Sequence, residues 1–178
     1  MARYSSDHKE KTHAAIIDAA AERIRSGGFD ALGVASIMAE AGLTHGGFYA
    51  HFRSRDALLA AAVTRLFEKA CETVDYFEGK YGPDALEKYI DFYLSPRHRD
   101  DVERGCPIPA LSGDAQRAAP EVRGAFEAGL ERLAERVEGA LRTVFLVKGD
   151  ADDDGDEPEQ HHRLVNAPEH QVDRAARD

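Results

Sequence analysis

The pattern of hydrophobic and polar residues predicts helices along most of the chain up to residue 146. Apolar residues recur at intervals of three and four, the spacing of one face of an α-helix. The expected helices cover residues 7–26, 34–41, 54–77, 84–94 and 120–146, with a short helix after Pro109. No segment shows the sustained alternation that is typical of a half-buried strand. The sequence therefore predicts an all-α fold.

Two short helices joined by a tight turn are expected between Val34 and Phe52. Gly42 tolerates the left-handed backbone that ends a helix, and Thr44 offers a hydroxyl as the N-cap of the second helix. A helix, a glycine-containing turn and a second helix form the helix-turn-helix outline, in which the second helix enters the major groove of DNA. The first helix has an apolar face of Val34, Ile37, Met38 and Ala41.

The other helices also have predicted apolar faces. Ser54 and Asp56 are capping candidates for the long helix, and Gly79, Gly82 and Pro83 mark its end. Residues 97–104 are expected to form a charged loop. The N-terminal helix has a face of Ala14, Ile17, Ala20, Ala21 and Ile24; the helix at 84–94 has Leu86, Tyr89, Ile90 and Tyr93; the last has Val122, Phe126, Leu130, Leu133, Val137 and Leu141.

Composition indicates a soluble globular protein of one or two small domains, with 178 residues of which 43% are hydrophobic. No apolar run is long enough for a membrane span, and the N-terminus has no signal-peptide core. We therefore expect a cytoplasmic protein without a membrane partner. Two cysteines without CxxC spacing, Cys71 and Cys106, favour a reducing compartment, and the sequence predicts neither a metal site nor a cofactor.

The net charge of −10 is unevenly distributed. Residues 1–60 are neutral, residues 61–148 carry −3 and residues 149–178 carry −7. A locally basic surface on the N-terminal block is therefore compatible with nucleic acid binding. The acidic tail has few large aliphatic residues, so we expect disorder or a marginal helix there. Its histidines, His161, His162 and His170, fit a solvated polar segment better than a metal site.

The segment THAAIIDAAAERIRSGGFDALGVASIMAEAGLTHGGFYAHFRSRDALL resembles the DNA-binding domain of TetR/AcrR-family transcriptional repressors. The most specific part of the resemblance is AGLTHGGFYAHFRSRDAL. The resemblance implies a three-helix helix-turn-helix head in residues 1–56 and a helical ligand-binding and dimerisation domain in residues 57–148, incomplete at its C-terminus and followed by the tail. It also implies a homodimer on a palindromic operator in double-stranded DNA and a small-molecule effector.

The expected recognition helix supplies most of the predicted DNA contacts. Its N-terminus favours a phosphate and enters the groove first, which makes Thr44 and His45 the first candidates. Gly46 and Gly47 are poor helix formers, and their lack of side chains would let the helix sink into the groove. Phe48 and Phe52 are expected to pack in the core.

Further phosphate contacts are predicted around that helix. Tyr49 and His51 can donate to phosphates and match the family's tyrosine and histidine at these places. Arg55 stands where the family usually has a lysine, and its charge can serve the same phosphate. Ser36 can also reach a phosphate, although the polarity of its helix explains it equally well. The candidate DNA-binding residues are Ser36, Thr44, His45, Gly46, Gly47, Tyr49, His51 and Arg55.

Cys106 is a candidate for effector sensing because a cation next to a thiol favours the reactive thiolate, and Arg104 is close in sequence. Related repressors with a glycine–cysteine pair at this place include responders to electrophiles. The alternative is a cysteine that only fills space, which is also the interpretation we favour for Cys71.

Two other classes of function remain as alternatives to an effector-released repressor. An enzyme is disfavoured because the sequence has no nucleophile elbow, P-loop, HExxH or dinucleotide fingerprint. The second alternative is a truncated or frame-shifted regulator that acts only as a helical interaction protein. It arises because the family dimerises through two further C-terminal helices, and neither apolar helix follows Leu146. Dimerisation would then have to use residues 120–146 and their neighbours.

Overall fold

The computed structural model describes residues 2–102 and 104–149, with side-chain surroundings for residues 8–142 apart from 103. The described residues are helical and contain no strand, as predicted. The expectations for the tail, including His161, His162 and His170, lie outside them. The elements are α1 (Ala2–Gly27), η1 (Phe29–Ala31), α2 (Val34–Glu40), η2 (His45–Ala50), α3 (Arg55–Tyr81), η3 (Gly82–Asp84), α4 (Ala85–Tyr93), α5 (Pro96–Asp100), α6 (Pro107–Arg117) and α7 (Pro120–Gly149), where η denotes a 3-10 turn.

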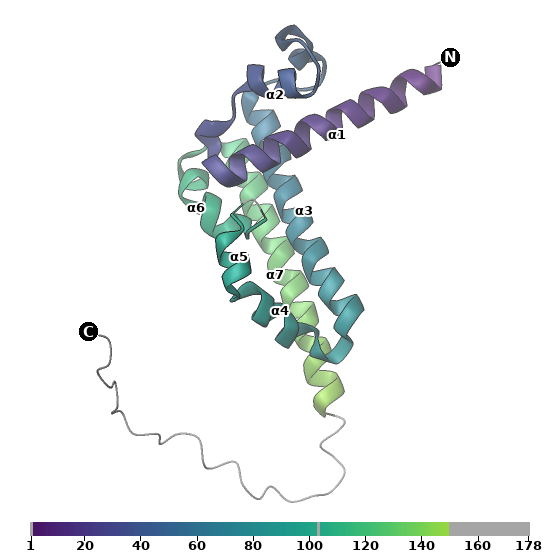
Figure 1. Cartoon of the computed structure of the whole chain (residues 1–178), viewed down its shortest axis with the longest axis vertical. Coiled ribbons are helices and arrows are strands. Elements are labelled where there is room, and N and C mark those ends of the chain that lie inside the picture. Colours follow the sequence, from purple (N-terminus) through teal and green to yellow (C-terminus); the bar gives the residue numbers. More distant parts are fainter. Residues whose placement is uncertain (1, 103, 150–178) are drawn as a thin grey trace, which may run out of the picture.

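The long helices α3 and α7 lie side by side and form the axis of the molecule (Figure 1). Gly129 allows this close approach, since a Cβ atom there would lie 2.3 Å from Cδ2 of Phe67. Phe126 packs edge-on against the same ring, with 5.2 Å between the ring centroids. Helices α4, α5 and α6 lie along one side of the α3–α7 pair. Helix α1 crosses the pair at the end near α2 (Figure 1).

One hydrophobic core joins the N-terminal head to the rest of the molecule. It includes Ile16 and Ile24 of α1, Ile37 and Met38 of α2 and Phe67 of α3. The predicted face of α1 was partly wrong, because Ile16 is fully buried while Ile17 is only partly buried. Neighbouring positions on a helix differ by about 100°, so the packing partners decide which of two adjacent isoleucines faces inward.

The ends of several helices differ from the prediction. Helix α1 begins at Ala2 rather than near residue 7, and α6 begins at Pro107 rather than after Pro109. The expected loop at 97–104 contains α5, because Pro96 suits the first helical turn and the Ser95 hydroxyl accepts the His98 N–H at 3.1 Å. Ser54 caps α3 as predicted, accepting the Ala57 N–H at 3.0 Å.

Contacts between the head, residues 1–56, and the rest of the described molecule, which we call the body, hold α1 and η1 against α6. The Phe29 N–H donates to a carboxylate oxygen of Asp114 at 2.9 Å. Gly28, with φ of 73°, turns the chain toward this contact. Arg53 and Glu121 add an exposed ion pair at 2.5 Å. None of the helices within 2–102 and 104–149 combines the length and apolar character that a membrane span requires.

Candidate nucleic-acid interface

The helix-turn-helix outline is present, but its second element is the 3-10 turn η2 rather than the expected α-helix. Gly42, with φ of 70°, ends α2 as predicted, and the Leu43 N–H donates to the Met38 carbonyl at 2.8 Å. Two consecutive glycines, each costing about 1 kcal/mol relative to alanine in an α-helix, explain why the short second element is not α-helical.

Thr44 occupies the N-cap position of η2 with an extended backbone, but its hydroxyl accepts no capping hydrogen bond from the described residues. The predicted hydroxyl cap is therefore wrong. The main chain closes the turn instead, because the Gly47 N–H donates to the Thr44 carbonyl at 2.9 Å. The Thr44 side chain is exposed and need not give up a capping bond to contact another molecule.

Burial divides η2 into an inner and an outer side. Phe48 is 2% exposed and Phe52, just beyond the turn, is 5% exposed, so both pack in the core as predicted. Tyr49 is 70% exposed. Thr44, His45 and Gly46 are also exposed, so the turn presents a polar and glycine-lined surface to solvent. Ser36 is exposed on α2.

Protein packing does not require glycine at positions 46 and 47. A Cβ atom on Gly46 would meet only the Thr44 hydroxyl oxygen, at 4.0 Å. On Gly47 it would lie 3.7 Å from the same oxygen and 3.8 Å from Cε of Met38, which are ordinary van der Waals distances. Neither glycine has a positive φ. Packing within the described residues therefore does not explain the two glycines.

The structure gives Arg55 a role inside the head. Its Nε donates to the Leu32 carbonyl at 3.2 Å and its Nη2 donates to the Phe29 carbonyl at 2.5 Å. The guanidinium thus ties the start of α3 to the segment that leads into α2. Sequence reasoning missed this use, because carbonyls more than twenty residues away become neighbours only after folding.

His51 lies at the boundary between the turn and α1. Its ring stacks near that of His13, with 6.0 Å between the centroids. Burial, then the charges of His13 and Lys9, lower the pKa of His51 below its ordinary value. Its Nδ1 is buried and makes no hydrogen bond to the described residues. His51 is therefore biased toward the neutral form.

Two cationic residues near the turn were not singled out from the sequence. Lys9 of α1 is exposed and lies close enough to act on His51. Arg53 follows the turn directly, and its side chain is 77% exposed although it pairs with Glu121. The sequence could have suggested the position of Arg53 beside the turn, because Arg53 follows Phe52 directly. It could not have suggested that Lys9 of α1 also lies there.

Cys106 lies in the body, at the N-cap of α6, and is half-buried. A side-chain hydrogen bond with Cys106, followed by burial, raises the pKa of Tyr93. Burial raises the pKa of Tyr89 to about 12 and lowers that of Arg25, both of which interact with Cys106. Cys71 is buried on α3, and burial raises the pKa of its thiol, consistent with its interpretation as a core residue.

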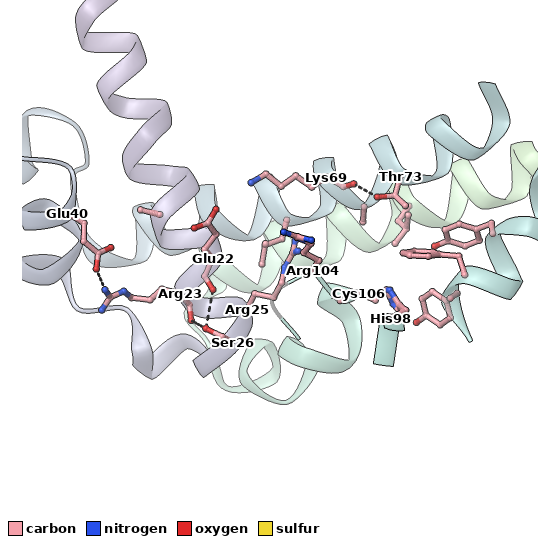
Figure 2. Close-up of a pocket in the computed structure, with 18 residues that line it drawn as sticks. Glu22, Arg23, Arg25, Ser26, Glu40, Lys69, Thr73, His98, Arg104 and Cys106 are labelled. Carbon is pink, nitrogen blue, oxygen red and sulfur yellow. Dashed lines mark hydrogen bonds and ion pairs between the residues drawn. The ribbon is translucent and has the colours of Figure 1, made fainter. Parts of the chain in front are cut away.

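Cys106, Arg25 and Arg104 line the same cavity, which has a volume of about 690 Å³ (Figure 2). We call it the junction cavity, because it lies between the head and α3, α4 and the segment before α6. The effect of Arg104 on the Cys106 thiol stays a prediction. Among the residues that the structure describes, no group of three or more His, Cys, Asp or Glu could hold a metal ion.

Comparison with known proteins gives matches in both sequence and structure. Residues 16–62 match the model of the bacterial regulatory proteins of the tetR family. The Bacillus subtilis (strain 168) protein YvdT, described as an uncharacterized HTH-type transcriptional regulator, is 32% identical over 109 residues. That match covers 57% of this chain and 53% of YvdT, so the chain spans about half the length of this curated relative.

Two solved structures share the fold over most of the chain. A TetR-family transcriptional regulator from Agrobacterium tumefaciens has a TM-score of 0.65 at 18% identity, covering 79% of this chain and 74% of its own. A TetR-family structure from Rhodococcus sp. has a TM-score of 0.62 at 21% identity, covering 83% and 77% respectively. At these identities the likeness concerns the fold alone.

Proposed function

We propose that the chain is a one-component repressor of the TetR family that binds double-stranded DNA through η2, because residues 16–62 match the model of that family and YvdT is 32% identical over 109 residues. Residues 1–56 form the DNA-binding head in this proposal, and residues 57–148 form the regulatory and dimerisation body. The observation that carries it is the glycine pair of η2, which is exposed or half-exposed and has space for side chains within the protein.

Close approach to DNA accounts for that glycine pair. A surface without side chains can enter the major groove more deeply than one with them. Tyr49, exposed beside the pair, can donate to a phosphate, and Thr44 and His45 stand where side chains enter the groove first. In this proposal the exposed Ser36 and the half-buried His51 add further phosphate contacts. The exposure of Ser36, Thr44, His45 and Tyr49 supports their roles.

In this proposal Arg55 acts mainly by positioning the helix-turn-helix. Its two hydrogen bonds to the carbonyls before α2 fix the angle between α3 and the helix-turn-helix. A phosphate contact by the same guanidinium would have to coexist with them. Lys9 and Arg53 supply additional positive charge near the turn, which favours phosphate without specifying sequence.

Repression requires two heads, since palindromic operators present half-sites about 34 Å apart on one face of DNA. We propose that a second copy pairs through α7 and its neighbours. An effector in the body, or an electrophile that reacts with Cys106, would favour a different separation of the heads and release the DNA. The half-buried thiol between Tyr93 and Arg25 supports Cys106 as the sensing residue.

Binding of the purified full chain to the DNA upstream of its own gene tests this proposal. Fluorescence anisotropy should show binding that weakens linearly on a plot of log affinity against log salt concentration, because phosphate contacts release counterions. A folded dimer that binds no upstream DNA even at low salt would overturn the proposal.

The alternative function, a helical interaction protein without repression, predicts a different result. Sedimentation analysis would then give a monomer, which offers a single head to the DNA. For the thiol, a Cys106→Ser protein should bind DNA normally and fail to release it after electrophile treatment. Normal release by this variant would remove Cys106 from the mechanism.

A further inference from the structure

More cationic than acidic side chains line the junction cavity, although the chain as a whole carries −10. Four cationic and two acidic side chains line it: Arg23, Arg25, Lys69, Arg104, Glu22 and Glu40. They come from α1, α2, α3 and the segment before α6, so folding gathers positive charge from distant parts of the sequence. Its volume of about 690 Å³ lies in the range of small-molecule sites.

The cationic side chains of the cavity differ in their ion pairs and in their burial. Lys69 pairs with Asp18 at 3.1 Å, and Arg23 pairs with Glu40. Among the described residues, Arg104 has a long contact with Asp101, at 3.7 Å. Arg25 is half-buried, and burial lowers its pKa, while Cys106, Glu22 and Asp101 raise it; an anion placed beside Arg25 would act in the same direction as these groups. Figure 2 shows Arg25 and Arg104 in the central part of the cavity.

An apolar groove of about 390 Å³ continues from the junction cavity between α4, α6 and α7. The two spaces share lining residues, namely Tyr89, Tyr93, Cys106 and Leu133. The periodicity of α4 and α7 predicted apolar faces here, but three of their members are exposed: Ile90 by 45%, Tyr93 by 37% and Leu130 by 40%. Leu94, just after α4, is exposed by 76%. A cationic compartment thus opens into an apolar one.

We propose that these two spaces together bind an amphipathic organic anion of the medium-chain carboxylate class, with its carboxylate near Arg25 and Arg104 and its hydrocarbon chain in the groove. The charge of the first compartment selects an anion. The exposed apolar side chains of the groove gain free energy when a hydrocarbon covers them, so pairing with a second copy has to use the surface of α7 that does not line the groove. This assignment names the class of effector and rests on the proposed function.

The position of the cavity links such a ligand to the head. The Arg23–Glu40 ion pair connects α1 to α2, and both side chains line the cavity (Figure 2). Arg23 and Arg25 are two residues apart on α1 and therefore face different directions, and the ion pair of Arg23 with Glu40 lies at the end of the cavity toward α2 (Figure 2). A ligand that fills the cavity as far as this end would meet the ion pair that connects α1 to α2, and would act through it on the orientation of η2.

Isothermal titration of the full chain with decanoate, 1-decanol and decyltrimethylammonium tests the proposal, because the three probes share a hydrocarbon chain and differ in head-group charge. We expect decanoate to bind saturably at one site per chain, the alcohol to bind at least about tenfold more weakly, a difference of ~1.4 kcal/mol, and the cation not to bind. Equal binding of decanoate and decyltrimethylammonium would overturn the assignment.

Variants locate the site. Arg25→Met should weaken decanoate binding at least about tenfold, and Arg104→Gln, at an exposed position, about threefold to fivefold. Arg123→Gln is a matched control, since Arg123 makes a similar exposed contact at 3.7 Å, with Glu127, and lies outside both spaces. Leu94→Glu should weaken decanoate binding through the groove. If Arg104→Gln and Leu94→Glu bind decanoate as tightly as Arg123→Gln, the assignment is wrong.

Upstream DNA binding measured without decanoate separates this inference from the proposed function. A protein that binds DNA but shows no preference for decanoate overturns the effector class alone. A protein that binds decanoate with the expected preference but no DNA supports the cavity assignment and overturns the repressor proposal.

Discussion

Two glycines, Gly47 in the head and Gly129 in the body, differ in whether the packing of the protein requires a residue without a side chain. Gly129 of α7 has no space for a side chain, because a Cβ atom would lie within 2.3 Å of the Phe67 ring. Gly47 of η2 has space, with its nearest neighbours at 3.7 and 3.8 Å. Packing therefore explains the first glycine and leaves the second unexplained. The proposal that DNA approaches η2 closely rests on this second kind of glycine, which packing within the described protein does not require.

The largest expected effect comes from closing the space that Gly129 provides. Gly129→Val should lower the free energy of unfolding by about 3 kcal/mol, the upper part of the usual range for overpacking, because α3 and α7 must separate. Chemical denaturation followed by circular dichroism measures this. Gly124→Ala, on the same helix with no neighbour within 4 Å, should be neutral or stabilising by up to about 1 kcal/mol. Equal effects of the two variants would contradict the account of the α3–α7 contact.

The second prediction separates stability from DNA binding at η2. Gly47→Ala should leave the free energy of unfolding unchanged or raise it by roughly 0.4–1 kcal/mol. Its affinity for upstream DNA should fall at least about tenfold, or ~1.4 kcal/mol, because the added methyl group meets the groove. Gly124→Ala again serves as the control and should bind DNA normally. Normal DNA binding by Gly47→Ala would break the contrast between the two glycines.

The third prediction concerns the contact that joins head and body. Asp114→Ala removes the acceptor of the part-buried Phe29 N–H, and should cost about 1–3 kcal/mol of stability. Asp114→Asn keeps an oxygen that can accept this hydrogen bond and should cost less. Thermal or denaturant unfolding of both variants measures the two losses of stability. Equal losses in Asp114→Ala and Asp114→Asn would show that the negative charge of Asp114, and not this hydrogen bond, is responsible.

The smallest expected effect is a pH dependence due to His51. Its pKa is lowered in the folded protein, so the unfolded chain takes up a proton first as the pH falls below about 6.5, the ordinary histidine value. The stability that this residue contributes is complete above that pH and declines below it, through the lowered pKa. His51→Gln should reduce this decline, measured by unfolding at pH 7.5, 6.5 and 5.5. An identical decline in the variant would place the effect elsewhere.

Local chemistry made the ends of several elements predictable from the sequence. Ser54 was expected to cap α3 and does so, and Gly42 was expected to end α2 and has the left-handed backbone required. The burial of Phe48 and Phe52 was also predicted correctly. These features depend on residues within a few positions of one another, so they are readable without knowledge of the fold.

Features that depend on distant residues were not predictable. The helical period placed Ile90 and Leu130 on apolar faces, but it could not tell which faces would be covered, and both are exposed. Arg55 finds its acceptors in the segment before α2, and the junction cavity collects Arg25, Lys69 and Arg104 from three separate segments. The sequence contains these charges but does not show that they meet.

The central claim is that the exposed side of η2 enters the major groove, and dimethyl sulfate footprinting tests it most directly. The reagent methylates N7 of guanine, an acceptor in the major groove. The full chain bound to its upstream DNA should protect guanines in two half-sites about one helical turn apart, and Gly47→Ala should lose that protection at the same protein concentration. Stable binding to this DNA without protection of any guanine N7 in the bound region would contradict the claim.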